Sequence, residues 1–470
     1  MTKVRINPLT RAHGYMAVEV DIQNGEVVDA WSSGLLFRGF EAMLKNRSPH
    51  DAVYLTQRIC GICSSAHAMA SSIALENAFD ISVPKNGYIL RNLTFGADML
   101  QNHLRNIYLL VIPDYITAPG GAPGGPPNND DIRLPKAVND RIQAHYLEAL
   151  ETSDLAHKAV AAFGGKAPHL QSIIAGGVTE QVLTDRIMHY QSLVSQIHSF
   201  VTEKMIPDIE DLSRYYDDYF NIGRGYGNLL SFGMFPVGAN NEDRIFKAGV
   251  LRNGQDNGNF DPDKITQDIA RAWYRGDEGA RAPFDGESTP FPQKADAYSW
   301  IKAPRYGGEP FEGGPLARMW FSGIYKNGIS VMDRLMARAI ETKEIAEKVN
   351  DWIHELVPDM PTINWINPLP ASGEAAGLVD SMRGTLAHWI RVQNHRIAAY
   401  RIITPSAWNL SPRDGEGRKG PVEEALIGTP VANRDNPVEV GRVIRSFDPC
   451  ISCAVHVLQK DGTSKPWRQF

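Results

Sequence analysis

The sequence reads RICGICSSAH at residues 58–67 and DPCISCAVH at residues 448–456. These two stretches contain all the cysteines of the chain: Cys60, Cys63, Cys450 and Cys453. The four form two Cys-x-x-Cys pairs, one near each end. Chance would not place every cysteine in such a pair, so ordinary buried small side chains are a poor explanation. Close pairs indicate metal ligands or a redox motif.

Three kinds of site compete for the two pairs. Structural zinc sites use two such pairs, but usually within about 20 residues because the metal staples a small module. Here almost the whole chain separates them. A thioredoxin-like redox motif accounts for one pair only. A catalytic soft-metal site, with four thiolates converging from both ends of the chain, suits nickel and iron.

The composition is that of a soluble globular protein, with 43% apolar and 22% charged residues in a chain of 470 residues. A net charge of −6, without a basic run, argues against a nucleic-acid-binding surface. No apolar run approaches the roughly 18 residues that span a bilayer. Residues 1–20 lack an apolar segment and a small-residue cleavage site, so no signal peptide is expected.

Hydrophobic periodicity predicts a mainly α-helical protein with small β-sheets (α+β) and no internal repeat. An N-terminal hairpin turning at Asn24-Gly25 is expected, because Asn-Gly between alternating runs is a strong hairpin signal. Residues 224–318 indicate short strands, residues 384–408 a second hairpin, and residues 119–131 a surface loop. A helix is expected to follow residue 63, and others to cover residues 87–114, 135–163, 179–220 and 323–356. Pro207 is expected to break or kink the helix over 179–220. A last helix is expected to run toward Phe447, with Asn436 as its N-cap and Pro437 as its first residue.

The residues around the cysteines narrow the choice of site. The patterns RxCGxCxxxH and DPCxxCxxH together resemble the signature of the nickel–iron hydrogenase large subunit, and the resemblance runs from end to end. Further matches follow in the order typical of that family: FRGFE at 37–41, MRGTLAHW at 382–389, TPSAWNLSPRD at 404–414 and GPVEEALIGTP at 420–430. The resemblance implies one compact domain, residues 1–456, in which both chain ends meet at a buried dinuclear centre.

The family's activity is the reversible heterolytic cleavage of dihydrogen into two protons and two electrons. By resemblance, Cys60 and Cys450 are terminal ligands of nickel, and Cys63 and Cys453 bridge nickel to an iron that carries cyanide and carbon monoxide. The chemistry needs a Lewis-acidic metal and a base. Thiolates are soft donors that stabilise such metals and also accept a proton.

Three side chains are expected around these metals. Arg383 matches a guanidinium held over the open metal face, with an ordinary surface arginine as the alternative. Because a guanidinium is nearly always protonated, polarising or orienting the substrate is the safer role. Asp448 is expected to pair with Arg383 or to hydrogen-bond near the site. His67 is expected to donate to a bridging sulfur, or else to pack in the core.

A second metal and several partners follow from the same resemblance. Glu41, the backbone carbonyl of Ile402, and His456 match the positions that hold a magnesium or iron ion, and oxygen ligands suit magnesium. No cysteine remains for an iron–sulfur cluster in this chain, so electrons must leave through another protein. An iron–sulfur small subunit is therefore expected, in a heterodimer or higher oligomer, together with nickel chaperones and a maturation endopeptidase.

The chain departs from the family pattern near the N-terminus. TRAHGY at 10–15 replaces TRIEGH, so His13 stands in place of the glutamate credited with taking protons from the terminal cysteine. Histidine relays protons near neutral pH, and His13 either does so or only packs. Asn102 stands where some relatives carry an aspartate, and Met382 replaces a proline common before Arg383.

The rival function is a hydrogen sensor with the same metal centre; a metal-free relative within a respiratory complex is disfavoured by the four cysteines. The tail VLQKDGTSKPWRQF (457–470) favours the enzyme, because sensors of the family generally lack one. Its three cationic side chains would be unfavourable to bury unpaired, so cleavage between His456 and Val457 after nickel insertion is expected. A periplasmic location, or association with a membrane through a partner, is favoured over a cytoplasmic one.

Overall fold

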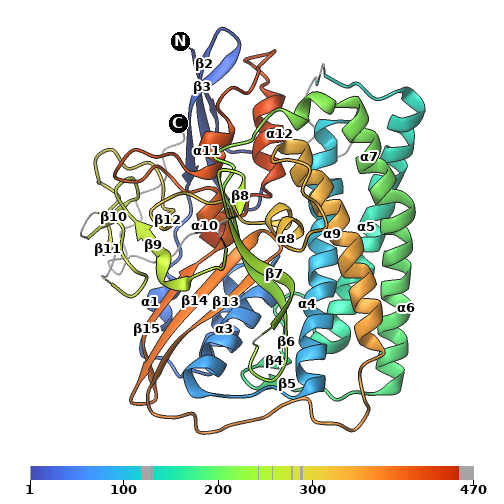
Figure 1. Cartoon of the computed structure of the whole chain (residues 1–470), viewed down its shortest axis with the longest axis vertical. Coiled ribbons are helices and arrows are strands. Elements are labelled where there is room, and N and C mark those ends of the chain that lie inside the picture. Colours follow the sequence, from blue (N-terminus) through green and yellow to red (C-terminus); the bar gives the residue numbers. More distant parts are fainter. Residues whose placement is uncertain are drawn as a thin grey trace, which may run out of the picture.

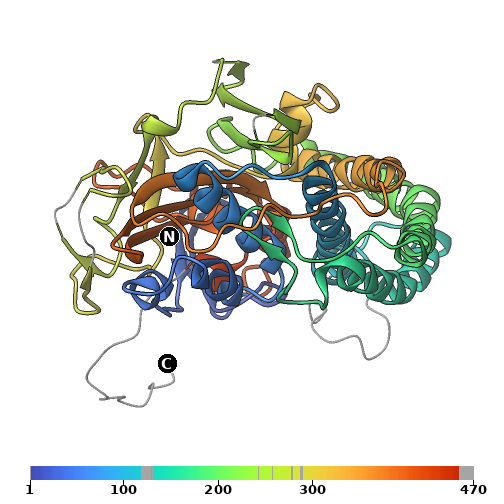
Figure 2. The same cartoon turned by 90° about the horizontal axis from the view of Figure 1, so that it is seen from below.

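A computed structural model describes residues 2–117, 129, 131–241, 243–256, 258–276, 279–285 and 289–454, with Cys453 and Ala454 described only by their backbone. A bundle of long helices lies beside a half built from small sheets and short helices (Figures 1 and 2). The predicted α+β fold with small sheets is confirmed. Within these residues, none of the helices combines the length and the apolar character that a membrane crossing requires.

The bundle is built around α4 (Lys85–Arg105), which contacts α5 (Lys136–Gly164) and α9 (Val331–Ile353). α6 (Thr184–Phe200) and α7 (Ile206–Tyr215) complete it. The sequence predicted an amphipathic helix here. Instead α4 is buried on almost every side, because neighbours cover both of its faces, and it continues as a π-helical turn, Asn106–Val111.

The break expected at Pro207 is present in a specific form. α6 runs into a π-helical turn, Val201–Met205, and α7 then begins with Pro207 in its first turn. Proline has no N–H to donate, so it is tolerated in a first helical turn, and π-turns are a common cause of helix irregularity. Residues 179–183 and 323–330 lie outside the helices that were predicted to include them.

The N-terminal sheet has the order β1 (Thr2–Ile6), β2 (Met16–Gln23), β3 (Glu26–Gly34), all antiparallel. Gln23 pairs with Glu26, so Asn24 and Gly25 form a two-residue turn with φ of 51° and 84°. Positive φ at both turn residues is what a type I′ hairpin needs, and Asn-Gly adopts it readily. The predicted hairpin is confirmed.

A second antiparallel sheet holds the predicted C-terminal hairpin, β14 (Gly384–Gln393) and β15 (Arg396–Ile403), plus an unpredicted strand, β13 (Gly373–Ser381). Helix α3 (Ser64–Phe79) packs against it. The approach is so close that a Cβ on Gly377 would lie 2.0 Å from the carbonyl oxygen of Ala70. Only glycine fits there.

The last predicted helix, α12 (Val438–Ser446), begins at Val438 rather than at Pro437. Pro437 has ψ of 72°, which is not helical, so it takes the cap position that was assigned to Asn436. Helix α8, Pro315–Phe321, was not predicted. Most of the loop expected at 119–131 lies outside the described residues.

The remaining elements are short. The helices are α1 (Phe40–Leu44), α2 (Asp51–Thr56), α10 (Pro405–Asn409), α11 (Pro421–Ala425), α12 (Val438–Ser446), α13 (Ile451–Ala454) and the 3₁₀ turns Gln57–Ile59, Ile112–Asp114, Asp217–Phe220 and Pro262–Lys264. The strands are β4 (Ile173–Ile174), β5 (Gly177–Val178), β6 (Leu229–Val237), β7 (Asp243–Arg252), β8 (Gln255–Asp256), β9 (Ile265–Asp268), β10 (Tyr274–Arg275), β11 (Thr289–Pro290) and β12 (Ala303–Tyr306).

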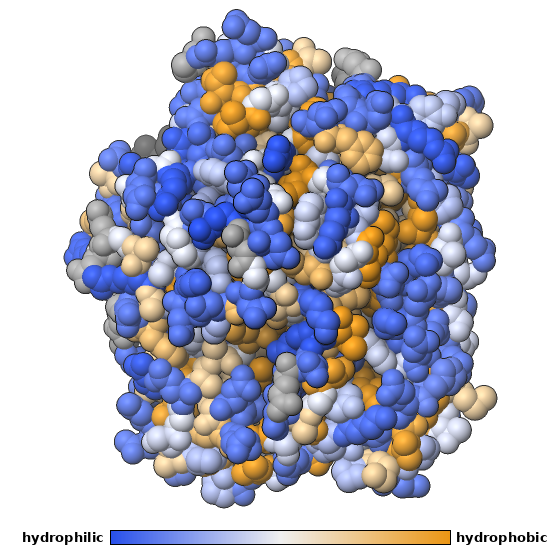
Figure 3. Space-filling view, viewed as in Figure 1, coloured by the Kyte–Doolittle hydropathy of each residue, from blue (hydrophilic) through white to orange (hydrophobic). Residues whose placement is uncertain are grey.

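One hydrophobic core joins the two halves. A single cluster of buried apolar side chains runs from Leu9 to Ile451 and includes Cys60, Cys63 and Cys450. The surface in the same view is mostly hydrophilic, with apolar residues interspersed (Figure 3). The cysteine motifs therefore lie inside a core that elements from the whole chain build.

Candidate metal centre

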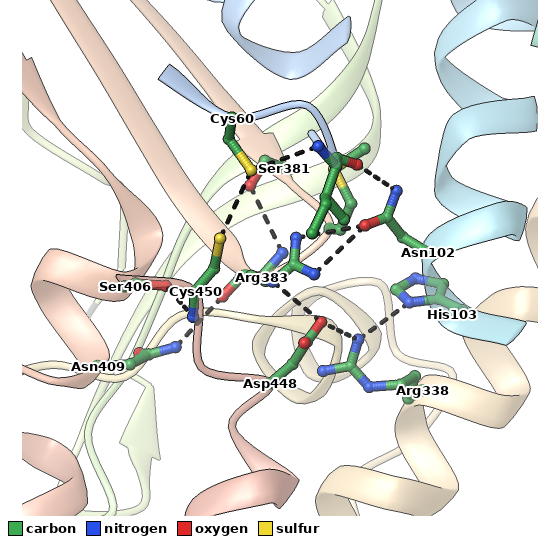
Figure 4. A network of polar contacts seen from close by, with 12 residues as sticks. Cys60, Asn102, His103, Arg338, Ser381, Arg383, Ser406, Asn409, Asp448 and Cys450 are labelled. Carbon is green, nitrogen blue, oxygen red and sulfur yellow. Dashed lines mark hydrogen bonds and ion pairs between the residues drawn. The ribbon is translucent and has the colours of Figure 1, made fainter. Parts of the chain in front are cut away.

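Cys60 and Cys450, from opposite ends of the chain, lie side by side in the interior (Figure 4). Their Sγ atoms are 3.6 Å apart, well beyond the ~2.05 Å of a disulfide bond. Cys63 is also buried and immediately precedes the first residue of α3. The two ends of the chain therefore meet where the sequence placed the metal site.

Backbone pairing between the two chain ends holds this arrangement. The N–H of His13 donates to the carbonyl of Pro449 at 3.1 Å, and the N–H of Ile451 donates to the carbonyl of His13 at 2.6 Å. His13 and Cys450 thus form a parallel bridge. The N–H of Cys450 donates to Ser406 Oγ at 3.1 Å, which anchors the C-terminal motif to α10.

The donor set fits a soft metal. A metal at about 2.3 Å from both sulfurs would see Cys60 and Cys450 at an angle of about 100°, so the 3.6 Å separation suits one shared ion. Thiolates select nickel, iron or zinc over magnesium or calcium. Among the side chains that the structure describes, no three His, Cys, Asp or Glu residues are arranged as a complete metal site. The predicted fourth ligand, Cys453, has its side chain outside that description.

Arg383 lies in the two-residue turn between β13 and β14 and is buried, which excludes an ordinary surface arginine. Its Nε lies 3.2 Å from Asp448 Oδ2, so the expected pairing is present. Both Nη atoms donate to Asn102 Oδ1 at 3.3 Å. Burial alone would lower the pKa of Arg383, but Asp448 and the cysteine thiolates outweigh burial and raise the pKa above its usual range. The guanidinium is therefore a fixed positive charge.

A chain of buried polar side chains continues behind Asp448. Arg338 Nη1 lies 3.4 Å from Asp448 Oδ2 and 3.0 Å from His103 Nδ1. A guanidinium only donates, so Nδ1 of His103 accepts and the proton of the neutral ring is on Nε2. That Nε2 lies 2.9 Å from Glu341 Oε2, and Arg318 pairs with Glu341 at 2.6 Å. Burial, followed by Arg338, lowers the pKa of His103 to about 4, in keeping with a neutral ring.

His13 is partly buried beside this network. Burial and then the positive charge of Arg383 lower the pKa of His13 to about 4, so the ring is neutral at physiological pH. Its Nε2 makes no hydrogen bond with the part of the chain that the structure describes. Whether His13 relays protons or only packs stays a prediction.

His67 belongs to a separate series of buried, hydrogen-bonded side chains. Its Nδ1 lies 3.1 Å from His388 Nε2, and His388 Nδ1 lies 2.8 Å from the hydroxyl of Tyr400. That hydroxyl is 3.0 Å from Ser71 Oγ. These hydrogen bonds fix the ring of His67, which lies one helical turn beyond Cys63. The expected hydrogen bond from His67 to a bridging sulfur stays a prediction.

Two of the three predicted ligands of the second metal come together. The N–H of Ile402 donates to Glu41 Oε1 at 2.9 Å, which brings the carboxylate to the strand that carries the predicted carbonyl ligand. The ammonium of Lys302 lies 4.0 Å from the other carboxylate oxygen of Glu41. The third predicted ligand, His456, lies outside the described residues.

Several residues of the centre were not predicted from the sequence, namely Arg338, His103, Glu341, Arg318 and His388. Arg338 and Glu341 are three positions apart on α9 and read as the solvated face of an amphipathic helix, yet both are buried. The one available signal was their spacing, which puts both on one helix face. Nothing in the local sequence shows that this face of α9 packs against α4.

The comparisons with known proteins agree over almost the whole chain. The family model described as nickel-dependent hydrogenase matches residues 38–119, 127–328 and 322–456. The periplasmic [NiFeSe] hydrogenase large subunit of Desulfomicrobium baculatum is 36% identical, covering 98% of this chain and 96% of that protein. The hydrogenase-2 large chain of Escherichia coli (strain K12) is 30% identical, covering 98% of both.

Solved structures agree with the sequence comparisons. The H2-activated [NiFeSe]-hydrogenase of Dm. baculatum superposes with a TM-score of 0.93 at 38% identity, over 97% of this chain and 100% of that one. The reduced Ni-Fe-Se hydrogenase of D. vulgaris Hildenborough gives 0.93 at 39% identity, over 97% and 100%. This chain therefore belongs to the nickel-dependent hydrogenase family.

Proposed function

We propose that this chain is the catalytic large subunit of a nickel–iron hydrogenase, which reversibly cleaves dihydrogen into two protons and two electrons. The observation that carries the proposal is the meeting of Cys60 and Cys450 at 3.6 Å in the interior, with the buried Arg383–Asp448 pair alongside. The sequence has cysteine at all four positions of the two motifs. The proposed centre is therefore held by four sulfurs.

The metals would be held by Cys60, Cys63, Cys450 and Cys453, and the bound centre would supply Lewis-acid and redox chemistry. We infer that the iron carries cyanide and carbon monoxide, as the family resemblance implies. A cysteine sulfur is the nearest base, because a thiolate ligand accepts a proton. Arg383 is not a base here, since its raised pKa keeps the guanidinium protonated. It would polarise and orient the substrate with a planar, fixed cation.

Asp448 keeps that cation in place. Burial would raise the pKa of Asp448, but Arg383 and then Arg338 outweigh burial and lower it, so the carboxylate stays ionised. His13, whose carbonyl and N–H bracket Cys450, would pass the proton onward from the sulfur.

The second metal and the partners complete the proposal. Glu41, the Ile402 carbonyl and His456 would hold magnesium or iron near the C-terminal helix. An iron–sulfur small subunit would accept the electrons, and nickel chaperones and an endopeptidase would act during maturation. The continuous core supports one domain over residues 1–456. A relative with 36% identity is periplasmic, which favours the same compartment for this chain.

The test is metal analysis and dihydrogen oxidation on the purified complex with its small subunit. About one nickel per chain, infrared bands from iron-bound diatomic ligands, and dihydrogen-dependent dye reduction are expected. Cys450→Ser should abolish activity and nickel binding, because a hydroxyl is a poor soft-metal ligand. Ser452→Ala, two residues beyond Cys450 in helix α13, is the matched control and should keep its nickel. Stoichiometric zinc without the infrared bands would refute the proposal.

A further inference from the structure

Asp98 is a buried carboxylic acid near the metal centre that the proposed chemistry does not use. It lies on α4, one helical turn before Asn102. The amide nitrogen of Asn102 donates to the backbone carbonyl of Asp98 at 2.8 Å and lies 3.3 Å from Asp98 Oδ1. The other carboxyl oxygen accepts from the hydroxyl of Ser65, two residues beyond Cys63. Both oxygens therefore have defined partners.

These contacts give the amide of Asn102 a single orientation. Its Nδ2 also donates to the carbonyl of Ile62, between the two N-terminal cysteines, at 2.7 Å. Its Oδ1 faces the two Nη atoms of Arg383 (Figure 4). Arg383 can only donate and a backbone carbonyl can only accept, so a flipped amide would oppose like groups on both sides. Asn102 thus transmits a directed contact from Asp98 to Arg383.

We propose that Asp98 is a positioning residue for the reaction assigned above: through Asn102 it orients the guanidinium of Arg383, and through Ser65 it ties that guanidinium to the loop that carries Cys60 and Cys63. The inference rests on the proposed function. Its structural part, the link from α4 to the cysteine loop and to the β13–β14 turn, is independent of turnover. Asp98 acts through Asn102 and does not touch the metals.

The ionisation of Asp98 makes this link depend on pH. Burial raises the pKa of Asp98 to about 6, against the lowering effects of Ser65 and Arg105. Above this value the amide of Asn102 donates to a charged oxygen, and charge-assisted hydrogen bonds are roughly twice as strong as neutral ones. Below it the carboxyl is neutral and the link weakens. Turnover should therefore fall as the pH drops through about 6.

Other ionisable groups around α4 behave differently. Cys60 and Arg105 act on Asp98 directly. The elements packed against α4 add His157 on α5, Arg338 and Glu341 on α9, and Arg383 and Asp448 beyond Asn102. The pKa of Glu341 is about 2, and that of Asp448 is lowered, so both stay ionised near pH 6. Asp380, on β13, also has a pKa of about 6, so only a variant of Asp98 itself assigns the effect.

The experiment compares Asp98→Asn and Ser65→Ala with the matched control Ser64→Ala, all in the complex with the small subunit. Asp98→Asn keeps the shape of the side chain but cannot ionise. It should turn over about fivefold more slowly above the inflection, about 1 kcal/mol of barrier, and lose the inflection near pH 6. Ser65→Ala removes a contact that stabilises the charged form, so its inflection should move to higher pH. Ser64 neighbours Ser65 on α3 and accepts from the N–H of His169, so Ser64→Ala should keep the inflection of the parent.

A second readout does not need turnover. Infrared difference spectra between the parent and Asp98→Asn, taken at a series of pH values, should show a protonated-carboxyl band that appears near pH 6 and moves in Ser65→Ala. The subtraction removes the band of Asp380. An inactive complex that keeps this band would refute the hydrogenase assignment and leave the link intact. Retention of the kinetic inflection in Asp98→Asn, together with a difference spectrum that lacks this band, would overturn the inference about Asp98.

Discussion

Glu341 on α9 belongs to the network of buried polar side chains behind Arg383. Its replacement by glutamine tests how strongly that network stabilises the fold. Burial would raise the pKa of Glu341, but Arg318 and His103 outweigh burial and lower it from 4.5 to about 2. Since one pKa unit corresponds to about 1.4 kcal/mol, these contacts favour the ionised form by about 3 kcal/mol at neutral pH. Glu341→Gln should lower the free energy of unfolding by about that amount, because it leaves the buried guanidinium of Arg318 with only its longer ion pair to Asp380, at 3.5 Å.

The sign of the pH dependence gives a second check. The folded-state pKa of Glu341 is below its unfolded value, so the stabilisation is complete above pH 4.5 and is lost as the pH falls toward 2. Urea denaturation should therefore show the full deficit of Glu341→Gln near neutral pH and a smaller one in acid. The matched control is Glu347→Gln on the same helix, whose exposed pair with Lys343 spans 2.8 Å. It should change stability by less than about 1 kcal/mol, and equal losses in the two variants would contradict the reasoning.

Three further predictions concern the centre and its maturation. Arg383→Lys keeps the charge but loses the planar fork, so turnover should fall at least about tenfold, roughly 1.4 kcal/mol of barrier, with nickel still bound; full activity would remove Arg383 from the mechanism. His13→Gln should slow hydrogen–deuterium exchange into solvent while the infrared bands persist, and an unchanged exchange rate would mean that His13 only packs. The intact mass of the active chain should end at His456, and an active, nickel-loaded chain ending at Phe470 would refute the processing step.

The elements that the sequence predicted well are those whose signals are local. Asn24-Gly25 specifies its own turn through positive φ, and the strands on either side alternate clearly. Strand β13 was missed because its partner is needed to recognise it: Gly377 reads as a poor strand residue until α3 packs against it. Local propensity cannot show that a glycine is required by the close approach of a helix about 300 residues earlier in the chain.

The residues of the candidate metal centre show the same difference: those with a local sequence signal were predicted, and those that depend on tertiary packing were not. The cysteine spacing and the residues around it were sufficient to predict that Cys60 and Cys450 meet. The carboxylic acid next to Asn102 was not predicted, because Asp98 looks like any polar residue on a helix surface. It becomes significant only because α4 is buried on almost every side. Burial raises the pKa of a carboxylic acid and so changes what that group can do, and burial is decided by tertiary packing.

Charge balance explains why so many residues from distant segments converge on Arg383. In the described part of the chain, two guanidinium groups, those of Arg383 and Arg338, share the single oxygen Oδ2 of Asp448. Their other contacts, Asn102 and His103, are neutral. An uncompensated buried charge costs several kcal/mol, so each cation depends on further anions. Glu341 acts on Arg338, and the cysteine thiolates act on Arg383. The cysteine sulfurs would bind metal as thiolates, and as thiolates they raise the pKa of Arg383. The arginine pair and the thiolate cluster therefore stabilise each other, and neither could be built from one end of the chain alone.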